Sequence, residues 1–224
     1  MFEYINIFCT LLKRDLVIAI RDKTDFINSL TFFVIIIFLF PLTYGTDSEL
    51  IMKFTPGMIW ISALLATCLS LEGVFRSDFE DGTIEQLTLS RYPLTLISSA
   101  KIMAHWIIYS APLIVISLFM SLILSLPTNV IMVLFITLLL GTRILSLIGS
   151  IMVVLTVGLR GSMLLSLLIL PLSMPILIFS ILAINNAAIN QSTSAEIYFL
   201  GGMLVLAITL APIATAAALR VRMS

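Results

Sequence analysis

Residues 130–159 read VIMVLFITLLLGTRILSLIGSIMVVLTVGL, an uninterrupted apolar run with a single charged side chain, Arg143. About 20 mostly apolar residues are enough for a helix to cross the hydrocarbon core of a membrane. The rest of the chain has the same character, with 60% hydrophobic and 11% charged residues, whereas soluble domains carry about 25% charged residues. The sequence therefore predicts an all-α membrane protein.

Five further runs have the length and composition of membrane-spanning helices. They are residues 26–44, 54–71, 94–126, 162–184 and 197–219, so the prediction is six transmembrane helices. The run at 130–159 would measure about 45 Å as a helix, against a hydrocarbon core of about 30 Å. We interpret it as one crossing that is tilted, broken at Gly141 or Gly149, or extended along the cytoplasmic interface.

The basic residues set the orientation, because Lys and Arg accumulate in cytoplasmic segments of membrane proteins. With six crossings and a cytoplasmic N-terminus, Lys53 is the one basic residue outside and Arg143 the one within a span. Both termini are therefore predicted to be cytoplasmic. The basic residues on that side are Lys13, Arg14, Arg21, Lys23, Arg76, Arg91, Lys101, Arg160, Arg220 and Arg222.

The segment before the first span, residues 1–24, has apolar side chains at helical spacing from Tyr4 to Ala19. This pattern predicts an amphipathic helix that lies on the cytoplasmic membrane surface. A helix of the soluble type that docks on a partner is the alternative interpretation.

Several function classes are excluded by what the sequence lacks. It has no GxxxxGK[ST], HExxH or GxSxG motif, so we expect no catalytic residues and a chain that is not an enzyme. No acidic residue lies inside a predicted span, which disfavours an ion-coupled carrier. Cys9 and Cys68 are far apart and lack a neighbouring histidine, so no metal site is expected. Twelve basic and twelve acidic residues balance, which leaves no basic surface for nucleic acid.

The polar loop at 72–92 is the informative segment between the second and third spans. Thr83 and Gln86 have the spacing of a capping box, and Glu85 would lie in the first turn of a helix. Gly82 can form the preceding turn, and Pro93 limits the length of the helix. The pattern predicts a short helix along the membrane surface that can dock in a groove of a cytoplasmic partner. A solvated, capped loop is the alternative.

The sequence from Asp81 to Leu87, Asp-Gly-Thr-Ile-Glu-Gln-Leu, resembles the coupling helix of ABC-2-type permeases. The whole chain resembles the CcmB family, the membrane component of the haem exporter in bacterial cytochrome c maturation. The resemblance extends along the chain, through Phe40-Pro41-Leu42 with Gly45, Pro56 to Trp60, Phe75 to Leu87, Ala100 to Trp106, Leu138 to Thr142, Leu155 to Leu159, Leu170 to Leu172, and Ala214 to Arg220.

The resemblance implies one permease domain over residues 1–224 with an ABC-2 (type V exporter-like) fold, in the bacterial inner membrane. It also implies a half-transporter that pairs with a second copy of itself and with a separate ABC ATPase subunit, which binds the ATP. A haem-handling membrane partner and a periplasmic haem chaperone complete the implied complex. The implied function is haem export, with haem as possible cargo, or release of the haem-loaded chaperone. A non-transporting scaffold for haem ligation is the alternative.

Two groups of candidate site residues follow from this resemblance. His105 and Arg143 are candidates for a haem or dimer contact. His105, the one histidine, would be an iron ligand or an interfacial side chain. Arg143 would snorkel, form an ion pair at the dimer contact, or contact a haem propionate. The residues predicted to couple to the ATPase are Arg76, Asp78, Glu80, Asp81, Gly82, Thr83, Glu85 and Gln86.

Overall fold

The computed structural model describes residues 2–21, 24–44, 48–156 and 163–223, and these residues form helices and turns without any strand. The prediction of an all-α protein is therefore confirmed. The helices are α1 (Phe2–Arg21), α2 (Thr24–Tyr44), α3 (Ser48–Glu80), α4 (Thr83–Thr88), α5 (Leu94–His105), the π-helix η1 (Trp106–Ser110), α6 (Ala111–Ile123), α7 (Thr128–Thr156), α8 (Met163–Ala188) and α9 (Ser194–Met223).

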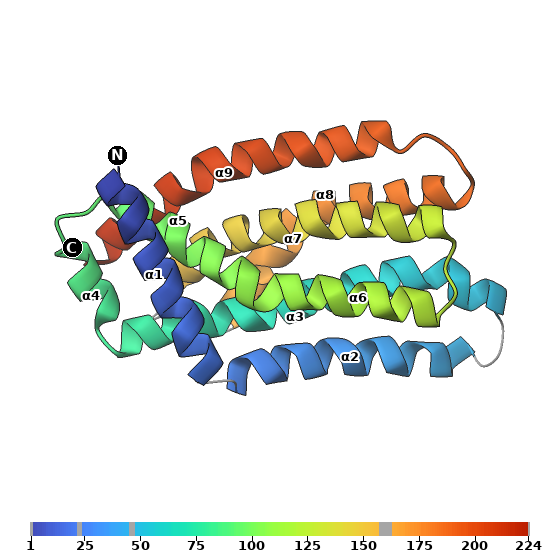
Figure 1. Cartoon of the computed structure of the whole chain (residues 1–224), viewed down its shortest axis with the longest axis horizontal. Helices are drawn as coiled ribbons and strands as arrows, with labels where there is room; N and C mark the ends of the chain where they lie inside the picture. Colours follow the sequence, from blue (N-terminus) through green and yellow to red (C-terminus); the bar gives the residue numbers. More distant parts are fainter. Residues whose placement is uncertain (1, 22–23, 45–47, 157–162, 224) are drawn as a thin grey trace.

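The long helices lie side by side along the long axis of the molecule (Figure 1). α1 lies obliquely across one end of this bundle, and α4 lies at the same end. Both chain termini are also found there. We call this end, which carries α1, α4 and the C-terminal turns of α9, the α4 end.

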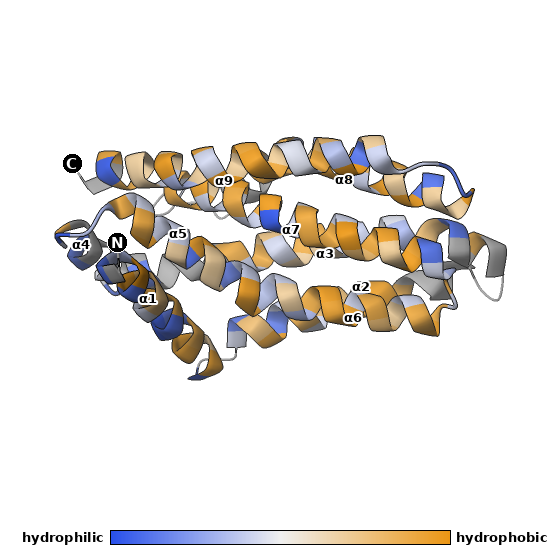
Figure 2. Cartoon of the chain, turned by 45° about the horizontal axis from the view of Figure 1, so that its top comes forward, coloured by the Kyte–Doolittle hydropathy of each residue, from blue (hydrophilic) through white to orange (hydrophobic). Residues whose placement is uncertain are grey.

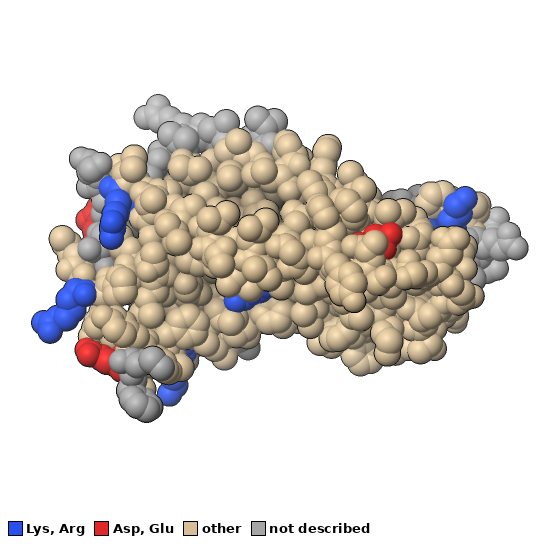
Figure 3. All heavy atoms as spheres, turned by 90° about the horizontal axis from the view of Figure 1, so that it is seen from above, with Lys and Arg blue, Asp and Glu red and all other residues tan. Residues whose placement is uncertain are grey.

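Five helical segments are long and apolar enough to cross a membrane: 53–71, 94–123, 128–156, 168–188 and 194–221. In α2, the apolar part with described side chains, Thr24–Leu39, is shorter. Hydrophobic residues cover the long helices, whereas hydrophilic residues gather on α1 and α4 (Figure 2). Viewed from above, charged side chains gather at the α4 end, and most of the remaining surface is uncharged (Figure 3). These features are those of an integral membrane protein.

α7 is the central helix of the bundle and packs against α3, α8 and α9. It runs unbroken through Gly141 and Gly149, so the break at either glycine, one of the three interpretations of this run, does not occur. Both glycines instead allow α3 to approach closely. A Cβ on Gly141 would overlap the ring of Trp60, and one on Gly149 would overlap Leu71. Small residues serve the same purpose where membrane helices pack tightly.

The third apolar run is helical throughout, but its hydrogen bonding changes at its centre. In η1 the N–H of Ala111 donates to the carbonyl oxygen of Trp106, five residues earlier. Pro112 follows at once, and its ring would clash with the carbonyl of Ile108 in a regular α-helix. The π-helix therefore accommodates Pro112 without ending the helix.

The second apolar run continues as a helix beyond its predicted end. The apolar span ends at Leu71, as predicted, but the helix α3 extends to Glu80, through the first half of the polar loop. Polar side chains do not end a helix by themselves, and 72–80 contains no proline. The polar loop is thus a helical extension of α3, followed by a turn and α4.

Candidate functional site

The predicted short helix in the polar loop is confirmed as α4, residues Thr83–Thr88. Gly82 has a φ of +69°, a left-handed conformation that glycine adopts without steric cost. The N–H of Gln86 donates to the carbonyl oxygen of Gly82 at 3.3 Å. The helix begins at Thr83, so Gly82 takes the position before its first residue, where the capping-box pattern had indicated Thr83. The glycine turn thus separates α4 from α3.

The predicted coupling residues divide into two groups in the structure. Asp81, Glu85 and Gln86 are exposed at the α4 end, and Gly82 and Thr83 are half-buried. Asp78 points inward to another helix. For Arg76 and Glu80 only the backbone is described, as part of α3, and their side chains lie outside the described ones.

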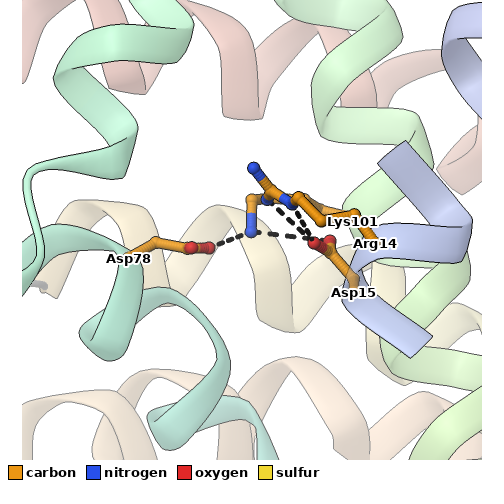
Figure 4. Close-up of polar contacts among 4 residues, drawn as sticks. All are labelled: Arg14, Asp15, Asp78 and Lys101. Carbon is orange, nitrogen blue, oxygen red and sulfur yellow. Dashed lines mark hydrogen bonds and ion pairs between the residues drawn. The ribbon is translucent and has the colours of Figure 1, made fainter. Parts of the chain in front are cut away.

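Asp78 contacts Lys101 of α5, which is the centre of a four-residue ion cluster (Figure 4). Nζ of Lys101 also lies 3.6 Å from Oδ2 of Asp15 on α1. Nη2 of Arg14 lies 2.8 Å from Oδ1 of Asp15, and Nε of Arg14 donates to the same oxygen at 2.9 Å. We call Arg14, Asp15, Asp78 and Lys101 the Lys101 cluster. It joins α1, α3 and α5, which are far apart in sequence.

The Lys101 cluster balances two cations with two carboxylates in a mostly buried setting. Lys101 is only 6% exposed, and an isolated buried ammonium is very unfavourable. Residues 86–195 contain no Asp or Glu, so the counter-ions of Lys101 have to come from outside this segment. Breaking a buried pair by removing one partner typically costs about 3–5 kcal/mol, because the other charge is left uncompensated.

A cavity of about 410 Å³ borders this cluster between α1 and the α4 end of α3 and α5. Asp25, Asp81 and Thr83 line it together with the cluster, and Ile108 and Tyr109 line its inner part. Two helices that flank this space, α1 and α3, are therefore connected through the side chain of Lys101 rather than by close packing there.

His105 lies one helical turn beyond Lys101 and is 1% exposed, so its side chain is buried among the helices. Its Nε2 lies 2.9 Å from Oγ of Ser70, and its Nδ1 lies 3.1 Å from Oγ of Ser146. A neutral imidazole has one N–H, so one serine accepts from the ring and the other donates to it. His105 thereby connects α5 to α3 and α7, and both of its nitrogens are already hydrogen-bonded.

Arg143 lies half-buried near the middle of α7, beside Trp106 of η1. Its Cζ is 5.3 Å from the ring centroid of Trp106, a distance typical of a cation–π contact. Nε1 of Trp106 donates to Oγ1 of Thr142 at 3.1 Å, which fixes the orientation of the ring. Nη1 of Arg143 is buried and lacks a hydrogen-bond partner within the described part of the chain.

The structure thus brings together residues that the sequence patterns did not connect. Asp78 belongs to the predicted coupling set, whereas Asp15 was considered only as part of the N-terminal segment. Arg14 and Lys101 were counted among the basic residues of the cytoplasmic side. The cluster could have been predicted from the lack of acidic residues over 86–195, because a buried Lys101 then needs an acidic partner from a distant part of the sequence.

Comparison with known proteins gives matches over nearly the whole chain. The family model described as CcmB protein matches residues 6–222. Heme exporter protein B of Haemophilus influenzae is 47% identical over 216 residues, which cover 96% of this chain and 98% of the relative. The protein of the same name from Pseudomonas aeruginosa is 46% identical, with 96% and 97% coverage. That of Escherichia coli K12 is 42% identical, with 96% and 98% coverage.

Proposed function

The chain belongs to the CcmB protein family, and from this premise we propose that it is the permease component of a haem exporter in cytochrome c maturation. The observation that carries this function is the match to heme exporter protein B along almost the entire length of both chains. The five long apolar helices agree with a membrane permease. The alternative, a non-transporting scaffold for haem ligation, is not favoured.

We further propose that α2 is the sixth transmembrane helix and that the fold is of the ABC-2 (type V exporter-like) kind. Its 21 residues measure about 31 Å, close to the thickness of a hydrocarbon core. The position of both termini at the α4 end agrees with an even number of crossings (Figure 1). By the positive-inside bias, the α4 end faces the cytoplasm of a bacterial inner membrane, because most basic residues are on that side.

The energy source in this proposal is a separate ABC ATPase subunit that docks on the α4 end. α4 is a short helix held between α3 and α5. Glu85 and Gln86 on α4, and Asp81 just before it, expose polar side chains. A partner that binds α4 can therefore move α3 and α5 together. The remaining proposed partners are a second copy of the chain, a haem-handling membrane protein and a periplasmic haem chaperone.

Haem is the proposed cargo of the complex, either exported or released on its loaded chaperone. Arg143 is the better placed of the two candidates for a haem or dimer contact, because Nη1 lacks a partner in the described structure. His105 is the weaker candidate, since it would have to break a bond to Ser70 or Ser146 before binding iron.

Charge reversal at α4 tests the coupling proposal. We expect Asp81→Lys combined with Glu85→Lys to abolish co-purification of the ATPase subunit, while the chain still inserts into the membrane. Glu3→Lys is the matched control, because Glu3 is an exposed acid on α1. Normal co-purification of the ATPase with the double variant would contradict docking at α4, whatever the behaviour of the control.

A further inference from the structure

Three helices that are separate in sequence meet at one lysine side chain. In Figure 4 the ammonium of Lys101 lies between Asp78 on α3 and Asp15 on α1. The side chain of Lys101 is 7% exposed, and those of Asp15 and Asp78 are 13% and 15% exposed. A buried ammonium held by carboxylates from two other helices restricts how these helices can move apart.

The position of the cluster relates it to both α4 and the third span. Asp78 lies on the last turn of α3, before the Gly82 turn and the start of α4. Lys101 lies one turn before His105, where α5 ends and the π-helix begins. Any displacement of α4 that shifts Asp78 therefore pulls directly on α5.

The surrounding contacts explain why the ion cluster, and not packing alone, would carry this movement. α1 packs on α5, and its Leu11 lies against the cluster of Leu94, Ile97 and Ala216. Between α1 and the end of α3, by contrast, lies the cavity of about 410 Å³. The side chain of Lys101 borders this space and reaches a carboxylate on each side of it.

We propose that Lys101 is a positioning residue that makes α1, the last turn of α3 and α5 move as one unit, so that α4 movement reaches the third span. This inference rests on the proposed ATPase-driven function. In this proposal the unit ends at η1, and the π-helix is the point at which α5 can change its angle relative to α6. α1 is then part of the moving machinery, in addition to being a membrane-surface helix.

The first test measures the coupling between ATP hydrolysis and cytochrome c maturation in the complex reconstituted with its ATPase subunit. The readout is the yield of mature cytochrome c per ATP hydrolysed. We expect Lys101→Met to lower this ratio at least fivefold. Lys13→Met, which removes an exposed lysine of α1, should leave the ratio within twofold of the unmodified complex. Lys101→Arg keeps a cation that can contact both carboxylates and should retain at least half of the ratio.

A merely structural role predicts a different result. Loss of folded protein would lower hydrolysis and maturation in parallel, and an unchanged ratio in Lys101→Met would overturn the inference. So would a Lys101→Arg variant in which the ratio falls as far as in Lys101→Met although the protein is inserted and folded. If the unmodified chain fails to bind an ATPase at all, the proposed function fails, and this outcome is distinct from the other two.

Spin-label distances give a second test that does not depend on transport. Cys9 on α1 is exposed and can be labelled, and Val115 on α6, which is 52% exposed, can be replaced by Cys. We expect the distance between the labels to change when a non-hydrolysable ATP analogue is added to the complex. In Lys101→Met this change should be lost. The same change with and without Lys101 would show that α1 and α5 are not joined by this residue.

Discussion

Gly141→Ala is the most direct perturbation of the central packing between α7 and α3. The added methyl would overlap Cη2 of Trp60 and lie 3.1 Å from Cζ2 of the same ring and 3.0 Å from Cγ2 of Ile176. Carbon atoms in contact prefer about 3.5–4.0 Å. Trp60 is 0% exposed, so the ring has no open space into which it can shift.

The expected size of the effect follows from two opposing contributions. Inserting a methyl group into a packed core costs about 1–3 kcal/mol, and the buried ring places this position in the upper part, about 2–3 kcal/mol. Replacing Gly by Ala within a helix gains up to about 1 kcal/mol. The net loss of stability is therefore about 1–3 kcal/mol for Gly141→Ala. Gly201→Ala on α9 meets nothing within 4 Å and should gain up to about 1 kcal/mol.

The assay is equilibrium unfolding in mixed micelles with increasing SDS, followed by tryptophan fluorescence, which comes from Trp60 and Trp106 in most variants and from Trp106 alone in the Trp60→Phe variants. Trp60→Phe removes Cη2 and Cζ2, so combining it with Gly141→Ala should recover at least about 1 kcal/mol relative to the sum of the single changes. If Gly141→Ala proves as stable as Gly201→Ala, the close approach of α3 and α7 at this glycine is wrong.

Three further predictions concern the polar groups inside the bundle. Ser70→Ala removes a hydrogen bond to His105 and should lower the free energy of unfolding by about 0.6–1.7 kcal/mol in the same assay. The control is Ser180→Ala, which should leave this free energy unchanged because the buried hydroxyl of Ser180 has no partner in the described structure. Equal effects of the two changes would show that the bond to His105 is not stabilising. His105→Ala should reduce stability, because it breaks the hydrogen bonds to both Ser70 and Ser146. Cytochrome c maturation per folded complex should be unchanged. Loss of maturation at normal levels of the complex would support the interpretation of His105 as an iron ligand. Arg143→Leu should lower cytochrome c maturation, and Arg143→Lys should retain part of it, because the proposed contact needs a cation at this position. Full maturation with Arg143→Leu would rule out the haem contact and the dimer contact and leave snorkelling as the interpretation of Arg143.

The features that were predicted correctly are those that depend on residues close to one another in the sequence. Apolar runs of sufficient length predicted the long helices, and the Gly82 turn with Pro93 predicted α4. The extension of α3 to Glu80 was missed because hydropathy marks the edge of the membrane and not the end of a helix. The suggested break in α7 at Gly141 or Gly149 was wrong because the glycines accommodate Trp60 and Leu71 of another helix.

The candidate site could be predicted only in part, since its contacts connect distant segments. The polar loop pointed to Asp78, but nothing local indicated that Lys101, and not a cytoplasmic partner, would contact it. The contact between Asp15 and Lys101 was even harder to predict, because Asp15 is one of many charged residues in the N-terminal segment. The serine partners of His105 belong to α3 and α7, so its burial could not be deduced from its neighbours in sequence.

The one-sided distribution of acidic residues has a consequence for biogenesis. Asp15 and Asp78 leave the ribosome before Lys101, and no carboxylate follows until Glu196. The counter-ions are thus in place when the lysine enters the bilayer, and its charge is neutralised on arrival. A fragment that starts after residue 85 would insert Lys101 without them, and co-expression of residues 1–85 as a separate chain should restore its stable accumulation.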